Sequence, residues 1–318
     1  MSRFPRPRAL APVLVALAVL LAGCSAGYRP TDVPYRPTPT QRGGGLTQEC
    51  SNPGRSFDPS ELPPAGQVPS NSSMGRVADR GRLIVGVSSD TLTMASRDAR
   101  TGDITGFEID LARGIAEAIL GPGAKLDLRV VTPADALAQI DGGEIDLVID
   151  QVAMDCAAWN GAAVSAPYLS TDHAAIERPG VSPSADAAER RSVCTPAGTA
   201  IDAWIGSQAP SRPRVTGRTW SDCLMKFQRG EADSLVAPRP IARGLAAQDP
   251  YAEVGPEPWI PISFAVLAPK QNRDMIRFVN AVLAQRVSSG EWQRSYDRWV
   301  RPYAGDGRPP QPQYGRAA

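Results

Sequence analysis

The hydrophobic and polar positions of the chain repeat one pattern twice. In residues 136–149 an apolar helical segment ends at Gly142-Gly143, an acidic residue follows, and residues 145–149 form a short apolar run. Residues 223–237 repeat this order, with Gly230 after the helix and Asp233 before the apolar run. A glycine after the last turn is a common helix C-cap, and a short apolar run bounded by turn residues is typical of a buried strand. Two copies about ninety residues apart predict two similar α/β lobes, because a solenoid requires at least three short repeats.

The remaining elements follow from the same two periodicities. Further strands are expected at residues 82–87, 125–131, 191–194, 214–216 and 259–268, and further helices at residues 111–119, 200–206, 241–248, 275–287 and 290–299. Alternating strands and helices are typical of α/β sheets, whose ligands bind in the crevice at the carboxyl ends of the strands. We therefore expect a ligand-facing loop directly after residues 145–149.

Residues 1–24 have the features of an export sequence. Arginines at positions 3, 6 and 8 precede an apolar stretch, residues 9–22, that is too short to span a bilayer comfortably. It ends in residues 20–24, Leu-Leu-Ala-Gly-Cys, which resemble a bacterial lipobox. The resemblance implies cleavage into residues 1–23 and a mature chain with an acylated Cys24, anchored at the extracytoplasmic face of the cell membrane. The alternative is an ordinary signal peptide with a chance cysteine.

Two segments are expected to lack a fold. Residues 24–79 are rich in Pro, Gly, Ser, Thr and Arg, a composition that buries too little apolar surface to offset the entropy of ordering. We interpret them as a disordered linker from Cys24. Residues 304–318 form a Pro-rich tail and are expected to be disordered as well.

Charge and cysteine content narrow the function classes. With 34 basic and 33 acidic residues the net charge is +1, which gives no indication of a nucleic-acid partner. Beyond Cys24 an even number of cysteines predicts two disulfides with three possible connectivities; they are Cys50, Cys156, Cys194 and Cys223. Cys194 and Cys223 belong to one lobe, which favours their pairing and leaves Cys50 with Cys156. No zinc-type spacing is present and His173 is the single histidine, so neither a metal nor a cofactor is expected.

Six ordered blocks of sequence carry a resemblance to a known family. They are residues 81–86, 105–112, 146–147, 165–168, 198–199 and 290–292. Together they resemble the family 3 extracellular solute-binding proteins, the amino-acid receptors of ABC importers, and in particular the glutamine/glutamate-binding lipoproteins of actinobacteria. The resemblance implies a type II periplasmic-binding-protein fold, with lobe one at residues 80–168 and 264–303, lobe two at residues 169–263, and hinge strands near residues 168–171 and 263–266. It further implies a small-molecule ligand between the lobes and an ABC permease with its ATPase as partners.

The residues with which the family holds an amino acid are replaced in this chain. The position of the arginine that binds the ligand carboxylate is Ala158, and the position of the aspartate that binds the ammonium is Pro238. Two threonine positions become Ala153 and Asp155, and the aromatic positions correspond to Thr91 and Met94. Unpaired buried charges are costly, so a zwitterion held in the familiar way is disfavoured.

The remaining candidates permit an inverted polarity. Asp150, Gln151 and Asp155 follow the lobe-one strand, and Arg239 follows the lobe-two strand. We hypothesise that the acids face a cationic group and Arg239 an anionic group; the alternative is that Asp155 is a solvated cap and Arg239 a surface charge. Gly198 and Thr199 precede a helix, where free N–H groups suit an anion, although a plain N-cap is equally expected.

Three functions are considered, of which the first two remain open. The first is a substrate-binding lipoprotein of an importer. The second is a ligand-sensing or scaffold lipoprotein of the same fold that signals to a membrane sensor protein. An enzyme is not expected, because no paired carboxylates stand out and His173 has no triad partners in the sequence pattern.

Overall fold

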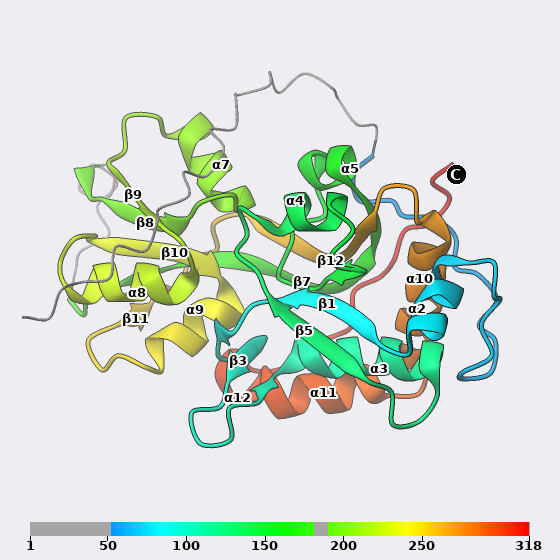
Figure 1. The fold of residues 1–318 in the computed structure, drawn as a ribbon. Helices are drawn as coiled ribbons and strands as arrows, with labels where there is room; N and C mark the ends of the chain where they lie inside the picture. The colour runs from blue at the N-terminus through cyan, green and yellow to red at the C-terminus, as the bar shows by residue number, and fades with distance from the viewer. Residues whose placement is uncertain (1–51, 181–189, 318) are drawn as a thin grey trace, which may run out of the picture. The chain divides into compact units, whose positions relative to one another are not determined.

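A central pair of long antiparallel strands joins two groups of parallel strands in the computed structural model, which describes residues 52–180 and 190–317 (Figure 1). Both groups belong to the unit formed by residues 49–318. The main sheet has the order β5-β1-β6-β12-β7-β10-β8-β9, with β11 added to β7. The expected α/β class is confirmed.

The first group builds its sheet from segments at both ends of the chain. Its parallel strands are β1 (Leu83–Val87), β5 (Leu126–Val130) and β6 (Leu147–Val148), and β12 (Pro261–Pro269) runs antiparallel beside β6. Its helices are α2 (Ser73–Arg80), α3 (Phe107–Leu120), α4 (Ala136–Asp141), α5 (Cys156–Gly161), α10 (Arg273–Ser288), α11 (Glu291–Trp299) and α12 (Arg301–Ala304). All residues of β1 are buried, and β1 pairs in parallel with both β5 and β6. A strand buried on both faces requires the continuous apolar sequence that β1 has.

The second group is continuous in sequence. Its strands are β8 (Val193–Pro196), β9 (Arg214–Gly217), β10 (Ser234–Pro238) and β11 (Glu253–Val254), and its helices are α7 (Ala200–Gln208), α8 (Trp220–Gln228) and α9 (Arg239–Ala246). The long strand β7 (Ala162–Glu177) pairs with β12 from Ala162 opposite Pro269 to Asp172 opposite Pro261. In the middle of this pair, where hinge strands were expected, the hydroxyls of Ser170 and Ser263 lie 2.8 Å apart.

The repeated sequence pattern has the same structural role in both groups. Asp146, before β6, accepts a hydrogen bond from the backbone N–H of Ile84 at 2.8 Å. Asp233, before β10, accepts one from the backbone N–H of Ser192, also at 2.8 Å. In each copy the carboxylate fixes the start of the neighbouring parallel strand, and a glycine with φ near +73° ends the preceding helix region, Gly143 in one copy and Gly230 in the other. The repeat therefore specifies the same strand pairing twice.

A small antiparallel sheet was not expected from the sequence. It consists of β2 (Asp90–Thr91), β3 (Ala95–Arg97) and β4 (Ile104–Thr105). Strands of two or three residues carry too little alternation to be recognised. The sheet leads into α3 at Gly106, whose φ is +145° and at which a Cβ would lie 2.1 Å from the carbonyl oxygen of Met94. Glycine is required there because the backbone of β3 approaches so closely.

The expectation of disorder up to residue 79 is wrong for the part that the structure describes. Phe57 is 4% exposed and packs edge-on against Trp159, with ring centroids 5.6 Å apart. The Ser56 hydroxyl donates to the carbonyl of Val164 at 2.8 Å, and the Asn280 amide donates to the Phe57 carbonyl at 2.8 Å. A few apolar residues spaced within a polar segment are sufficient to dock it, and average composition conceals them. Residues 24–51, which include the lipidation candidate Cys24, lie outside the described residues.

The expectation of a disordered tail is also wrong for residues 304–317. The backbone N–H of Ser56 donates to the carbonyl of Gln313 at 2.8 Å. The Arg316 guanidinium lies over the ring of Trp159, 3.7 Å from its centroid, and donates to the carbonyl of Arg55 at 2.8 Å. An extended Pro-rich segment keeps its carbonyls free as acceptors, so it can bind along a surface without forming a helix or a sheet.

Candidate functional site between the two strand groups

A cavity of about 80 Å³ lies where the two groups of strands meet. Its walls come from the loop after β6, from α4 and α5, from the start of α7, and from single positions on β7, α8, β10 and β12. The lining residues are Pro133, Ala136, Leu137, Asp150, Gln151, Val152, Ala153, Asp155, Ala157, Ala158, His173, Gly198, Thr199, Ala200, Ile201, Trp220, Pro238 and Ile262. Five of the sequence candidates are thus brought together: Asp150, Gln151, Asp155, Gly198 and Thr199.

The two groups of strands, with their helices, also contact each other beside this cavity. The Ser221 hydroxyl, on α8, donates to the carbonyl of Asp90 at 3.0 Å. Gly198, with φ +81°, lies so close to the start of α4 that a Cβ would be 2.8 Å from the Cα of Ala134. Gly198 therefore serves the approach of one backbone to another, and this explains why the position lacks a side chain.

Asp150 is a buried acid for which no counter-ion lies among the residues that the structure describes. Its side chain is 4% exposed, and within the described part of the chain its Oδ2 has no hydrogen-bond partner. Burial raises the pKa of this carboxyl well above its usual range, the negative charges of Glu108 and Asp90 raise it further, and a hydrogen bond from the Ser88 backbone opposes the shift. A cationic group in the cavity beside this carboxyl would offset the negative potential there.

Glu108 makes hydrogen bonds to the loop after β6 that contains Asp150 and Gln151. Its side chain is fully buried and accepts hydrogen bonds from the Tyr168 hydroxyl, from the Gln151 side-chain amide, and from the Gln151 backbone N–H at 3.0 Å. Burial raises the pKa of Glu108 to about 7, against the opposing effect of these hydrogen bonds. Glu108 and Tyr168 were not predicted from the sequence as neighbours of the site. The available signal was an acid inside the apolar start of the helix at residues 106–112.

Asp155 and Thr199 line the cavity but act as helix caps. Asp155 accepts a hydrogen bond from the Ala158 backbone N–H at 2.9 Å and so caps α5. Thr199 accepts one from the Asp202 N–H at 3.3 Å, caps α7, and donates its hydroxyl proton to the Pro196 carbonyl at 2.8 Å. The N-cap alternative considered for both residues describes their contacts.

Three candidates do not line the cavity. Thr91 is 1% exposed and bonds to the Ser88 hydroxyl at 2.9 Å, and Met94 is fully buried in the core. Arg239 donates to Asp172 through Nε at 2.8 Å and through a terminal nitrogen at 2.5 Å. The guanidinium of Arg239 is thus held by an acid that the sequence pattern did not single out, and the hypothesis that it faces an anionic group of the ligand stays a prediction.

His173, to which the sequence gave no catalytic or metal-binding role, lines the cavity. It is 1% exposed, and its Nδ1 lies 3.0 Å from the carbonyl of Ile260. Burial lowers the pKa of the imidazole, so it is neutral at physiological pH. Within residues 52–180 and 190–317 no grouping of His, Cys, Asp and Glu could hold a metal ion.

Disulfides connect elements that border the site. Cys194 on β8 and Cys223 on α8 are joined, which is the pairing that the sequence favoured. Cys156, at the start of α5, is also disulfide-bonded. Its expected partner Cys50 lies outside the described residues, so that connectivity stays a prediction.

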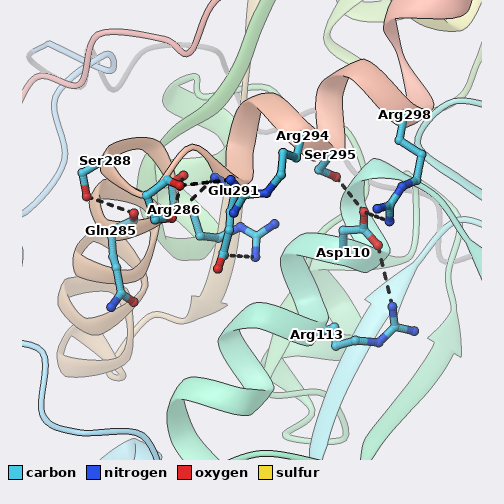
Figure 2. Close-up of polar contacts among 10 residues, drawn as sticks. Asp110, Arg113, Gln285, Arg286, Ser288, Glu291, Arg294, Ser295 and Arg298 are labelled. Carbon is cyan, nitrogen blue, oxygen red and sulfur yellow. Dashed lines mark hydrogen bonds and ion pairs between the residues drawn. The ribbon is translucent and has the colours of Figure 1, made fainter.

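A second polar cluster, which shares no residue with the cavity lining, joins α3, α10 and α11 (Figure 2). Asp110 on α3 accepts hydrogen bonds from the Ser295 hydroxyl and the Trp299 indole, each at 2.8 Å, and its carboxylate is 3.6 Å from Arg298. Arg286 on α10 pairs with Glu291 on α11 at 3.1 Å. These contacts fasten α11 to α3 and α10, and we assign the cluster a structural role.

Comparisons with known proteins agree with this architecture. The model of the bacterial extracellular solute-binding proteins, family 3, matches residues 83–302. The ABC transporter glutamine-binding protein GlnH of Bacillus subtilis (strain 168) is 20% identical over 231 residues, which are 72% of this chain and 85% of that protein. The L-cystine-binding protein TcyJ of Escherichia coli (strain K12) is 26% identical over 234 residues, 71% of this chain and 85% of that protein.

A solved structure of similar fold is the cysteine-binding protein from Campylobacter jejuni. It superposes with a TM-score of 0.70 at 16% identity, over 74% of this chain and 96% of that chain. At this identity the likeness shows the fold alone, which is the expected type II periplasmic-binding-protein fold. No helix among the residues that the structure describes is long and apolar enough to span a membrane.

Proposed function

Because the chain belongs to the bacterial extracellular solute-binding proteins of family 3, we propose that it is the ligand-binding component of an ABC importer. Its ligand is an amino acid or a related small polar metabolite held between the lobes, and closure on the ligand is recognised by a permease with its ATPase. No chemical step is assigned to the chain. The names of its relatives GlnH and TcyJ, a glutamine-binding and an L-cystine-binding protein, support this class of ligand.

The observation that carries the proposal is the cavity itself. It lies at the junction of the two strand groups and is lined by both of them, with Asp150 from one group and Thr199 from the other. A small ligand there would contact both lobes at once and so stabilise their closed arrangement.

A thermal-shift panel tests the proposal on the purified full-length chain. Amino acids, short amines and small polar metabolites are each added in large excess, and a true ligand raises stability by RT ln(1 + [L]/Kd), about 2.7 kcal/mol at a hundredfold excess over Kd. The expected result is a rise in Tm for a restricted chemical class. A flat profile across the whole panel would refute the binding function.

The proposal includes a lipid anchor at Cys24. The supporting observation is the Leu-Leu-Ala-Gly-Cys sequence at the end of an apolar stretch. Replacement of Cys24 by Ser is expected to move the protein from the membrane fraction to the soluble fraction and to abolish incorporation of labelled fatty acid. Unchanged membrane attachment in Cys24→Ser would contradict lipidation at this residue.

A sensing lipoprotein of the same fold is the second candidate. It is favoured by Ala158 and Pro238, which line the cavity but whose side chains cannot form ion pairs with the charged groups of an amino acid. Deletion of the gene distinguishes the two. Loss of uptake of the identified ligand supports import, whereas normal uptake with altered signalling through a membrane sensor protein supports the alternative.

A further inference from the structure

We propose that the cavity selects a short organic amine or guanidine without a carboxylate, with Asp150 as the partner of its cationic nitrogen. The inference rests on the proposed function, since it names the ligand class of that same site. It departs from the zwitterionic ligands named for the relatives, and four features of the cavity support it.

The first feature is the charge of the walls. Two acids, Asp150 and Asp155, line the cavity, and none of the described lining residues is Lys or Arg. The nearby Arg239 does not compensate, because Asp172 holds its guanidinium through two nitrogens. A ligand carboxylate would find no cationic side chain in these walls, and a buried unpaired charge is strongly disfavoured.

The second feature is that side-chain caps already occupy N–H groups at helix N-termini beside the cavity. Helix N-termini often bind carboxylates through free N–H groups. Several helices begin at the cavity, and the two whose capping side chains line it are α5 and α7. At α5 the Asp155 carboxylate already accepts from the Ala158 N–H at 2.9 Å, and at α7 the Thr199 hydroxyl accepts from the Asp202 N–H at 3.3 Å. The negative cap of α5 would also repel a ligand carboxylate, so the usual backbone site for an anion is closed there.

The third feature is the free acceptor on Asp150. This side chain is 4% exposed, its Oδ2 has no partner in the described part of the chain, and it contributes to the cavity wall. Glu108 and Asp90 add negative potential at Asp150, the Tyr168 hydroxyl is committed to Glu108, and the imidazole of His173 is neutral. A cation in the cavity beside the Asp150 carboxylate relieves the repulsion among the three acids.

The fourth feature is size. A volume of about 80 Å³ accommodates about five to eight water-sized groups when each requires 10–15 Å³. Putrescine, with six non-hydrogen atoms, fits this space, whereas glutamine and glutamate have ten. Apolar wall residues such as Ile262 and Trp220 suit the hydrocarbon part of such an amine.

Isothermal titration calorimetry on the full-length chain tests the proposal with four probes. Putrescine and cadaverine, with six and seven non-hydrogen atoms, are cations without a carboxylate, 1,4-butanediol is the uncharged analogue of putrescine, and L-glutamine is the zwitterion. At pH 8 we expect at least one of the two amines to bind and both butanediol and glutamine to fail. Amine affinity is expected to be lower at pH 5.5 than at pH 8, because protonation of the buried acids Glu108 and Asp150, whose pKa values are both raised, removes negative charge beside the cavity.

Two variants separate the role of Asp150 from a general effect on the fold. Asp150→Asn keeps the shape and removes the charge, and we expect it to lower amine affinity at least tenfold while its Tm stays within a few degrees of the parent. Asp249→Asn changes a buried acid that does not line the cavity and is expected to bind like the parent. If Asp150→Asn does not fold, the pH dependence and the butanediol comparison in the parent protein still decide the question.

The outcomes distinguish this inference from the proposed function. Binding of glutamine with no binding of either amine overturns the amine selectivity and leaves a solute-binding function intact. Amine binding that Asp150→Asn does not weaken overturns the role of Asp150. No binding by any probe overturns the amine inference, and the broader metabolite panel then decides the proposed function.

Discussion

The carboxylate of Glu108 accepts both the backbone N–H and the side-chain amide of Gln151, and the backbone contact measures 3.0 Å. Gln151 has a φ of +48°, a left-handed conformation that residues other than glycine seldom adopt. The paired hydrogen bonds hold the loop in this conformation directly after Asp150. A buried acid on α3 therefore shapes the cavity wall without lining it.

The first prediction concerns the pH dependence of stability through Glu108. Its pKa rises from 4.5 to about 7 on folding, so its neutral form contributes stability that is fully present below pH 4.5 and is lost as pH rises through about 7. The loss amounts to at most about 3 kcal/mol. Urea unfolding at pH 5 and pH 8 measures it, and Glu108→Gln is expected to reduce the difference.

Glu117→Gln is the matched control, because Glu117 lies on the same helix but is exposed. It is expected to leave the pH profile of the parent unchanged. An equal pH dependence in Glu108→Gln and in the parent would show that Glu108 does not titrate as described.

A second prediction concerns the ion pair of Arg239 with Asp172, whose side chains are 20% and 27% exposed. Arg239 lowers the pKa of Asp172 through hydrogen bonds. Since both groups retain contact with solvent, we expect Arg239→Ala to lower the free energy of unfolding by only about 1 kcal/mol. A double-mutant cycle with Asp172→Asn measures the pair, and ligand affinity is expected to change less than twofold. A tenfold loss of ligand affinity would show that Arg239 contributes to ligand binding.

The disulfide between Cys194 and Cys223 gives a third prediction. It closes a separation of 29 residues between β8 and α8, and a loop of that length contributes about 3.6 kcal/mol in the chain-entropy description. The double variant Cys194→Ala/Cys223→Ala is expected to unfold at correspondingly lower urea concentration. A reductant acts on Cys156 as well, so only the double variant isolates this bridge, and an unchanged midpoint would argue against its contribution.

The docked tail gives a fourth prediction. Removal of residues 305–318 eliminates the contact of Arg316 with the Trp159 ring and the hydrogen bond between Gln313 and Ser56. We expect faster amide exchange in α5, which carries Trp159, and a lower Tm. Arg316→Ala is the milder variant and is expected to change α5 in the same direction. Identical exchange in the parent and the truncated chain would show that the tail does not support α5.

The blocks of sequence that resemble the family mostly make contacts that hold helices and strands together. Asp110 bonds to Ser295 and Trp299 on α11, Trp292 donates to the Tyr168 carbonyl at 2.7 Å, and Asp146 fixes the start of β1. None of these residues lines the cavity. For this reason the sequence identified the fold while the ligand positions held unfamiliar residues.

The sequence by itself determined the two-lobed α/β arrangement, because helix and strand periods and glycine caps are local properties that a linear pattern records. It also placed Asp150, Asp155, Gly198 and Thr199 at strand ends and helix starts, where the cavity was found. Tertiary structure alone decided what these residues do. Arg239 pairs with an acid 67 positions away, and Glu108 reaches Gln151 across 43 positions. The partner of a charge depends on distances between segments remote in sequence, and burial then sets its electrostatic cost. Neither quantity has a local pattern from which it could be read.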